Sequence, residues 1–145
     1  MLNQDFKEFI ESLNNNKVRY LVIGGYAVAV HGYPRYTKDI DIWVDMSAEN
    51  ASNMMKALEE FGFGSLGINE SDFTLPEHML QLGYPPNQID ILTTIHGVDF
   101  SKCYDARKVE EIDGVSVNFI NLDDLKKNKK ATGRNQDLAD LENLE

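Results

Sequence analysis

Two aspartates, Asp39 and Asp41, stand one residue apart in a stretch that otherwise has the composition of a β-strand, Asp-Ile-Asp-Ile-Trp-Val. Aspartate is disfavoured in strands, and like charges close together on a sheet repel each other. Because side chains alternate between the two faces of a strand, both carboxylates should share one face, with Cα atoms about 6.5–7 Å apart. Ile40 and Ile42 should point the opposite way, into a core. Two carboxylates at this spacing can converge on one cation.

A third aspartate, Asp90, lies between Ile89 and Ile91 in a similar apolar stretch. On a neighbouring strand it would add a third carboxylate to the same face. Three aspartate oxygens, with room for water and phosphate oxygens, suit Mg²⁺, and Mn²⁺ as an alternative, because these cations prefer hard oxygen ligands. The simpler alternative, which these residues leave open, is an exposed sheet face on which the aspartates meet only solvent.

A glycine pair, Gly24-Gly25, directly follows an apolar stretch that we expect to be a strand, and it precedes a short helix expected over Tyr26–His31. Glycines at this place let a phosphate approach the backbone, and a helix N-terminus offers N–H donors to it. The spacing fits neither the dinucleotide-binding fingerprint nor a P-loop. A tight turn would explain the pair equally well, so the informative feature is that 13 residues separate the pair from Asp39.

Together, Gly24-Gly25, Asp39, Asp41 and Asp90 resemble the signature of the polymerase-β-type nucleotidyltransferase superfamily. The segments HGYPRYTKDIDIWVD, IDILTTIHGVDF and NKKATGRNQDLADLENL also resemble small stand-alone bacterial nucleotidyltransferase-like proteins, related to those of abortive-infection and toxin–antitoxin systems. The resemblance implies that the glycine turn holds a triphosphate. It also implies that the three aspartates bind the catalytic metals, with Asp41 or Asp90 nearest the incoming nucleophile.

The implied activity is Mg²⁺-dependent transfer of a nucleoside monophosphate from a nucleoside triphosphate to an RNA, protein or small-molecule acceptor, with release of pyrophosphate. The alternative is a catalytically weak nucleotide-binding module that acts through a protein partner, for example in a toxin–antitoxin pair, or as a homodimer. Gln88 and Gln136 stand where the resemblance leads us to expect basic residues. A substrate-facing charge is therefore expected to be missing at each place.

The loop before Asp39 holds three further candidates for contact with phosphate or substrate, Arg35, Thr37 and Lys38. Arg35 is suited to a bidentate phosphate contact because its guanidinium presents two parallel donors. The alternative for all three is an ordinary solvent-exposed loop.

A basic segment near the end of the sequence places five of the 14 Lys and Arg residues within residues 126–134. Cations at the end of a helix favour its macrodipole, which explains much of this segment without a ligand. Lys129 and Arg134 are the preferred phosphate-binding candidates, because they lie in a segment that carries the resemblance. Asp137 and Asp140 are expected on one side of the following helix, paired with a nearby Lys or Arg.

The elements that must position these residues follow from apolar periodicity and turn residues. Helices and strands alternate too irregularly for repeated βαβ units, so we expect an α/β (α+β) fold with a mixed central sheet flanked by helices and a C-terminal helical pair. The resemblance implies that this is the nucleotidyltransferase fold. Residues 63–87 carry no clear pattern, and Pro76 is the expected start of a short helix there. We expect helices near residues 6–13, 48–61, 122–132 and 135–144, with Ser47 as an N-cap and Gly62 and Gly133 as helix ends, and strands near residues 18–25, 39–44, 88–95 and 114–122.

The whole sequence fits one domain over residues 1–145, because its length is enough to bury a sizeable core. The net charge of −10 argues against an extended DNA-binding surface. We expect no transmembrane helix and no secretory signal. The single cysteine, Cys103, excludes an internal disulfide, and a cytoplasmic location is the matching expectation.

Overall fold

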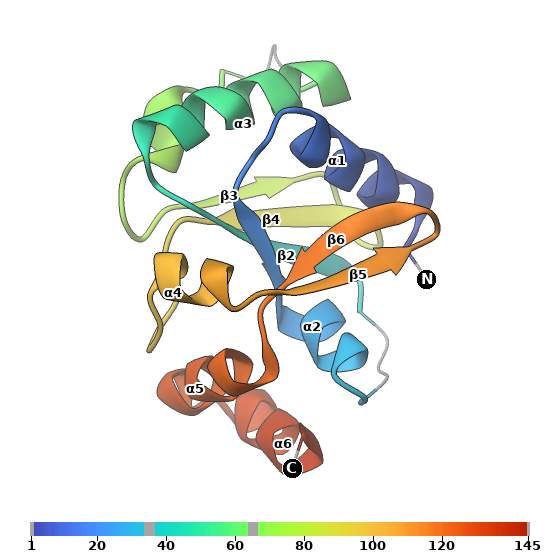
Figure 1. Ribbon diagram of the computed structural model, residues 1–145, viewed down its shortest axis with the longest axis vertical. Helices are drawn as coiled ribbons and strands as arrows, with labels where there is room; N and C mark the ends of the chain where they lie inside the picture. Colours follow the sequence, from blue (N-terminus) through green and yellow to red (C-terminus); the bar gives the residue numbers. More distant parts are fainter. Residues whose placement is uncertain (1, 34–36, 64–66, 145) are drawn as a thin grey trace.

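A computed structural model of the chain describes residues 2–33, 37–63 and 67–144. Its centre is a six-stranded mixed sheet with the strand order β3-β4-β2-β1-β6-β5 (Figure 1). The strands are β1 (Tyr20–Ile23), β2 (Asp39–Val44), β3 (Met79–Leu82), β4 (Gln88–Leu92), β5 (Lys108–Ile112) and β6 (Val115–Phe119). The helices are α1 (Gln4–Asn15), α2 (Gly24–Val30), α3 (Ala48–Phe61), the 3₁₀-helix η1 (Glu70–Phe73), α4 (Phe100–Asp105), α5 (Leu122–Thr132) and α6 (Asn135–Leu144).

Strand direction makes the sheet mixed, as expected from the irregular order of the elements. β2 runs parallel to β4, and β1 runs parallel to β6, whereas the β1–β2, β3–β4 and β5–β6 pairs are antiparallel. Helices α1 and α3 lie at one end of the molecule, and α2, α5 and α6 lie at the other (Figure 1). None of the described helices has the length and apolar character needed to cross a membrane.

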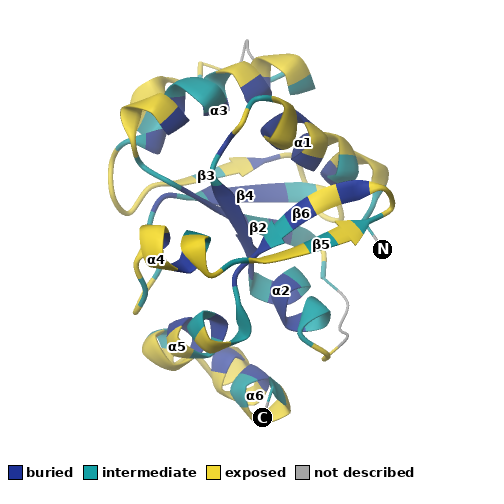
Figure 2. Cartoon of the chain, in the orientation of Figure 1, coloured by how far each residue is buried: buried dark blue, intermediate teal, exposed yellow. Residues whose placement is uncertain are grey.

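The core is built by the apolar stripes of the helices and by the central strands (Figure 2). Phe6, Phe9, Ile10 and Leu13 recur at helical spacing in α1, and all four are buried. Each such side chain contributes about 1.5–3 kcal/mol when it leaves water. The central strands are buried, whereas β3 and β5 form the two exposed edges of the sheet (Figure 2).

Helix ends follow local side-chain chemistry, as the sequence predicted. The Ser47 side chain accepts a hydrogen bond from the Asn50 N–H at the start of α3. Gly62 ends α3 and Gly133 ends α5, and both adopt a left-handed conformation that glycine reaches without steric cost. The Asp113–Gly114 turn joins β5 to β6.

Four features differ from the expectations. The glycine pair forms the first turn of α2, whereas the helix was expected to begin after it, at Tyr26. Pro76 lies in a turn, so the helix expected to start there is wrong, and η1 precedes that turn. The edge strands β3 and β5 were not expected, because they are largely exposed and so lack the apolar alternation that marks a strand with a buried face. The short helix α4 was not expected either.

Candidate active site

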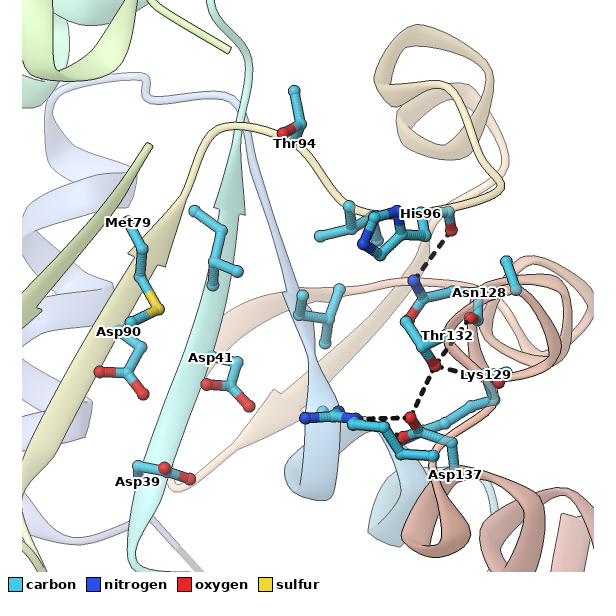
Figure 3. A pocket seen from close by; sticks show the side chains of 16 residues that line it. Asp39, Asp41, Met79, Asp90, Thr94, His96, Asn128, Lys129, Thr132 and Asp137 are labelled. Carbon is cyan, nitrogen blue, oxygen red and sulfur yellow. Dashed lines mark hydrogen bonds and ion pairs between the residues drawn. The ribbon is translucent and has the colours of Figure 1, made fainter. Parts of the chain in front are cut away.

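The three predicted metal-binding aspartates lie together on one face of the sheet. β2 pairs in parallel with β4 so that Asp41 stands directly opposite Asp90. One carboxylate oxygen from each of Asp39, Asp41 and Asp90 lies within 4.8 Å of the others. Figure 3 shows the three side chains pointing into the same pocket from the two strands. The neighbouring-strand placement predicted for Asp90 is therefore confirmed.

The opposite face of these strands explains why the sheet tolerates a self-repelling cluster. Ile40, Ile42, Ile89 and Ile91 alternate with the aspartates and are almost fully buried. At about 1.5–3 kcal/mol for each buried isoleucine, core packing outweighs the cost of placing three carboxylates side by side. The core therefore holds the aspartates where they are, whether or not a cation neutralises them.

The pKa of Asp41 reflects its burial and the charges of the two neighbouring aspartates. Burial, and after it the neighbouring charges of Asp39 and Asp90, together raise the pKa of Asp41 from its ordinary 3.8 to about 7. Near neutral pH the metal-free cluster therefore carries less than its full negative charge.

These residues fit a divalent cation. All three donors are carboxylate oxygens, the ligand type that Mg²⁺ and Mn²⁺ prefer. After burial, the charges of Asp39 and Asp90 are the next causes of the raised pKa of Asp41, and a cation would neutralise that repulsion. A metal bound here would polarise phosphate oxygens and neutralise charge that develops on a leaving group.

Two neighbouring side chains orient the carboxylates. Gln88 Nε2 donates hydrogen bonds to both oxygens of Asp90, at 2.9 and 3.2 Å. The Thr37 hydroxyl lies 2.9 Å from the Asp39 carbonyl oxygen and 3.2 Å from one of its carboxylate oxygens. Gln88 occupies a place where we expected a basic residue, and there it holds Asp90 through a neutral amide. Thr37, a predicted phosphate contact, is a direct support of Asp39.

Two constraints call for glycine at position 24, its backbone conformation and its closeness to Asp41. Its φ is +67°, a conformation that other residues rarely adopt. A Cβ at this position would lie 2.2 Å from Asp41 Oδ2. Only glycine lets the start of α2 approach Asp41 this closely. Gly24 lines the pocket, whereas Gly25 is buried within α2.

A second charged cluster joins α5 to α6. The ammonium group of buried Lys129 lies 3.2 Å from Asp137 Oδ1 and 3.0 Å from Asp140 Oδ2. Arg134 Nε lies 2.7 Å from Asp137 Oδ2, and the Thr132 hydroxyl lies 2.6 Å from the same oxygen. Although burial acts to raise the pKa of Asp137, hydrogen bonds from Arg134, Thr132 and Lys129 hold it well below its usual range. The predicted pairing of both aspartates is confirmed.

One open cavity of about 580 Å³ connects the two clusters. It is lined by all three sheet aspartates, Gly24, Lys129 and Arg134, and Figure 3 shows Lys129 across the pocket from the carboxylates. The cavity therefore has an acidic side suited to cations and a side that carries two basic groups. That combination fits a phosphate chain bound together with a metal.

The sequence did not single out several residues that line this cavity. They are Met79, Thr94, His96, Asn128 and Thr132. Asn128 Nδ2 donates to the His96 carbonyl oxygen at 3.0 Å, which ties α5 to the loop after β4. Asn128 and Thr132 lie four residues apart, so a helical projection of residues 122–132 would have placed both on one side.

Other candidates lie elsewhere. Lys38 is exposed at the start of β2 and does not line the cavity. Arg35 lies outside the described residues. Lys127 and Lys130 are exposed on α5, so of the basic segment Lys129 and Arg134 are the members that line the cavity among the described residues. His31 Nε2 lies 2.7 Å from the Ile120 carbonyl oxygen, which fits the packed histidine expected there.

Comparisons with known proteins agree with the observed fold. The model of the family DUF6036, described as a nucleotidyltransferase of unknown function, matches residues 1–145. A crystal structure of a candidate nucleotidyltransferase from Thermotoga maritima superposes with a TM-score of 0.64 at 19% identity, over 99% of this chain and 94% of that one. An antigenic nucleotidyltransferase-like protein from Paracoccidioides brasiliensis gives a TM-score of 0.57 at 19% identity, over 96% and 73%. A comparison with curated proteins gave no significant match.

Proposed function

Because the chain belongs to a family of nucleotidyltransferases of unknown function, we propose that it transfers a nucleoside monophosphate from a nucleoside triphosphate to an acceptor and releases pyrophosphate. Mg²⁺, with Mn²⁺ as a substitute, is held by Asp39, Asp41 and Asp90. The observation that carries the proposal is the placement of three carboxylates opposite two basic side chains across one cavity.

The triphosphate lies between the start of α2 and the basic side of the cavity. Gly24 leaves room for a phosphate oxygen close to the backbone, and Lys129 and Arg134 supply positive charge opposite the metal ligands. Lys38 is exposed next to Asp39 and supplies a further positive charge near the metal ligands, although it does not line the cavity.

The reaction is an in-line displacement at the α-phosphorus. An acceptor oxygen forms a bond to the α-phosphorus as the bond to the bridging oxygen of the β-phosphate breaks, and pyrophosphate leaves with that electron pair. Asp41 or Asp90, the two carboxylates that stand directly opposite each other, accepts the acceptor's proton. Positioning and electrostatic stabilisation supply most of the acceleration.

Calorimetry with each of the four nucleoside triphosphates, with and without Mg²⁺, tests the binding step. Transfer of an α-phosphate label to cell extract tests the chemistry. We expect binding that requires Mg²⁺, label transfer by the wild type, and loss of both in Asp90→Asn. Asp105→Asn, at the exposed end of α4, is the matched control and should behave as the wild type. Mg²⁺-independent binding would contradict the proposal.

A second candidate function is a nucleotide-binding module that acts through a protein partner, for example in a toxin–antitoxin pair. The observation that favours it is the state of Lys129, whose charge is already paired with two buried carboxylates. Neutral Gln88 and Gln136 in place of the expected basic residues add to it, since each donates instead to an aspartate. Mg²⁺-dependent nucleotide binding without label transfer to any extract would favour this function.

A further inference from the structure

Strand β5 forms the edge of the sheet that lies farthest from β3. It pairs with β6 on its inner side, and no other strand in the described ranges pairs with its outer side. Figure 2 shows most of β5 exposed, and Val109 near its centre is 52% exposed. An edge of this kind presents backbone N–H and C=O groups to which another strand can be added.

The turn between β5 and β6 decides which residues of β5 direct their backbone groups outward. It has two residues, both with positive φ, and Ile112 pairs with Val115 across it. The turn makes Ile112 and Val115 a hydrogen-bonded pair, and from there hydrogen-bonded and non-hydrogen-bonded pairs alternate along the ladder. Val109 and Glu111 fall at the alternate positions, so their N–H and C=O groups point away from β6.

The charges of this edge are ordered by sign along the chain. Arg107 and Lys108 are basic, Val109 is uncharged, and Glu110 and Glu111 are acidic. Lys108 and Glu110 already lie near each other, with Nζ 3.3 Å from Oε1, and both remain partly exposed. A second copy of the strand, running antiparallel, would therefore bring its acidic half against the basic half of the first.

One two-fold register satisfies the backbone and the charges together. When Val109 stands opposite Val109 of a second copy, the outward N–H and C=O groups of the two strands face each other. The same register places Lys108 opposite Glu110 and Arg107 opposite Glu111, each pair twice by symmetry. The neighbouring two-fold registers with the same backbone phase place Lys108 opposite Lys108, or Glu110 opposite Glu110. Charge therefore selects the register centred on Val109.

The surroundings of Val109 also favour this contact. Val109 stands opposite Asn118 on β6, and Glu111 stands opposite Ser116, so the β6 side chains on this face are polar. The buried β6 side chains, Val117 among them, belong to the other face. Across the two-fold axis the Cβ atoms of the two Val109 residues would lie about 4.5–5.5 Å apart, so each valine would cover the other.

We propose that the chain forms a homodimer in which the β5 strands of two copies pair antiparallel about a two-fold axis at Val109, joining their sheets into one. The contact is made by a five-residue strand, so its area falls at the low end for specific interfaces, and we expect a dissociation constant on the order of 10 µM. β1 and β6 separate this edge from β2 and β4, which carry the aspartates. The proposal therefore does not depend on the metal site or on nucleotidyl transfer.

Sedimentation velocity at increasing protein concentration tests the dimer, and charge reversals test its register. Lys108→Glu places glutamates opposite each other in the pair, and Glu110→Lys places lysines there. An equimolar mixture of these two variants restores opposite charges, provided that residue 108 of one copy faces residue 110 of the other. Lys56→Glu makes the same change at an exposed lysine of α3 and is the matched control.

We expect the wild type and Lys56→Glu to dimerise with similar dissociation constants. Each single reversal on β5 should weaken the dimer about tenfold, and the mixture should return to within about threefold of the wild type. A wild type that stays monomeric at every concentration would overturn the proposal. So would single reversals that dimerise like the wild type, equal weakening by Lys56→Glu, or a mixture that does not recover.

Disulfide trapping measures the register directly. Val109→Cys brings two thiols together at a Cα separation of about 5.5 Å, which a disulfide spans. Glu111→Cys places its two thiols about 14 Å apart along the strands, too far for a disulfide. The native thiol, Cys103, is buried. Mild oxidation should therefore link Val109→Cys into a covalent dimer and leave Glu111→Cys and the wild type unlinked on a non-reducing gel. Equal linkage of the two variants, or none in Val109→Cys, would contradict the proposed register.

Discussion

Two groups of aspartates lie at the same cavity, which Asp137 lines opposite the sheet aspartates, and their environments differ in one respect. Asp137 and Asp140 on α6 are ion-paired with Lys129, and Asp137 also with Arg134. The aspartates of β2 and β4 have no Lys or Arg within ion-pair distance among the described residues. The pKa of Asp137 is accordingly held low, and the pKa of Asp41 is raised. The charges of one cluster are paired within the chain, whereas the proposed function has the other neutralised by a cation from outside.

This contrast explains an inversion in α6. Helices usually bury leucines and expose aspartates, yet here Asp137 and Asp140 are buried, and Leu138 is 47% exposed. Burial of the two carboxylates is tolerated because Lys129 neutralises them within hydrogen-bond distance. Because the two buried carboxylates would be destabilising without a cation, Lys129 is held between them, and its position lines the cavity wall.

Removing the internal cation should have the largest effect. Lys129→Met leaves Asp137 and Asp140 buried without it, and loss of one partner of a buried ion pair costs about 3–5 kcal/mol. We expect a fall of that size in the free energy of unfolding measured with urea. Lys130→Met removes an exposed lysine from the same helix and should change stability by less than about 0.5 kcal/mol. Equal effects would show that the α5–α6 cluster is not a buried ion-pair network.

The next largest effect is expected when an extra side-chain atom is placed against the cluster of Asp39, Asp41 and Asp90. Gly24→Ala combines a strained φ with a Cβ placed against Asp41, and we expect about 2–3 kcal/mol of destabilisation together with weaker Mg²⁺ binding. Gly32→Ala is the matched control, because Gly32 also has a positive φ but no atom lies within 4 Å of its added Cβ. Calorimetric Mg²⁺ titration separates the two, and an unchanged Mg²⁺ affinity in Gly24→Ala would contradict the role assigned to Gly24.

Neutralising one member of the unpaired cluster should stabilise the metal-free protein. Asp41→Asn relieves repulsion with Asp39 and Asp90, so we expect the metal-free free energy of unfolding to rise by about 1–2 kcal/mol. The same change should abolish the stabilisation that Mg²⁺ gives to the wild type. A variant that is less stable without metal and still responds to Mg²⁺ would show that these aspartates do not form a metal site.

The pH dependence of stability should also distinguish the sheet aspartates from the aspartates of α6. The pKa of Asp41 is about 7 in the folded protein against 3.8 ordinarily, so between these values the unfolded chain binds fewer protons, and metal-free stability falls as pH rises. The pKa of Asp137 is lowered, so its contribution is complete above about pH 4 and is lost in acid. Urea unfolding from pH 5 to 8 should therefore show a decline that Asp41→Asn reduces. A decline of equal size in that variant would contradict this assignment.

Short-range patterns in the sequence, together with the family resemblance, predicted the carboxylate cluster. Alternation placed Asp39 and Asp41 on one face, and the shared Ile-Asp-Ile pattern placed Asp90 beside them, because one buried face fixes strand register. The exposed edge strand β3 has no such buried face, so Met79 and its pairing with Leu92 could not be predicted. The role of Gln88 depends on a hydrogen bond between side chains two residues apart, which residue types alone do not specify.

The basic side of the cavity was only partly predictable. Lys129 and Arg134 were selected from a run of lysines, and both line the cavity. Their contacts with Asp137 depend on how α5 turns into α6 at Gly133, a packing geometry that no local pattern encodes.

Thermal unfolding with ATP and increasing Mg²⁺, on the wild type and Asp90→Asn, tests the central claim most directly. If the three aspartates hold the metal that binds the triphosphate, the melting temperature of the wild type rises with Mg²⁺ in the presence of ATP, and that of Asp90→Asn does not. An equal rise in both proteins would contradict the claim.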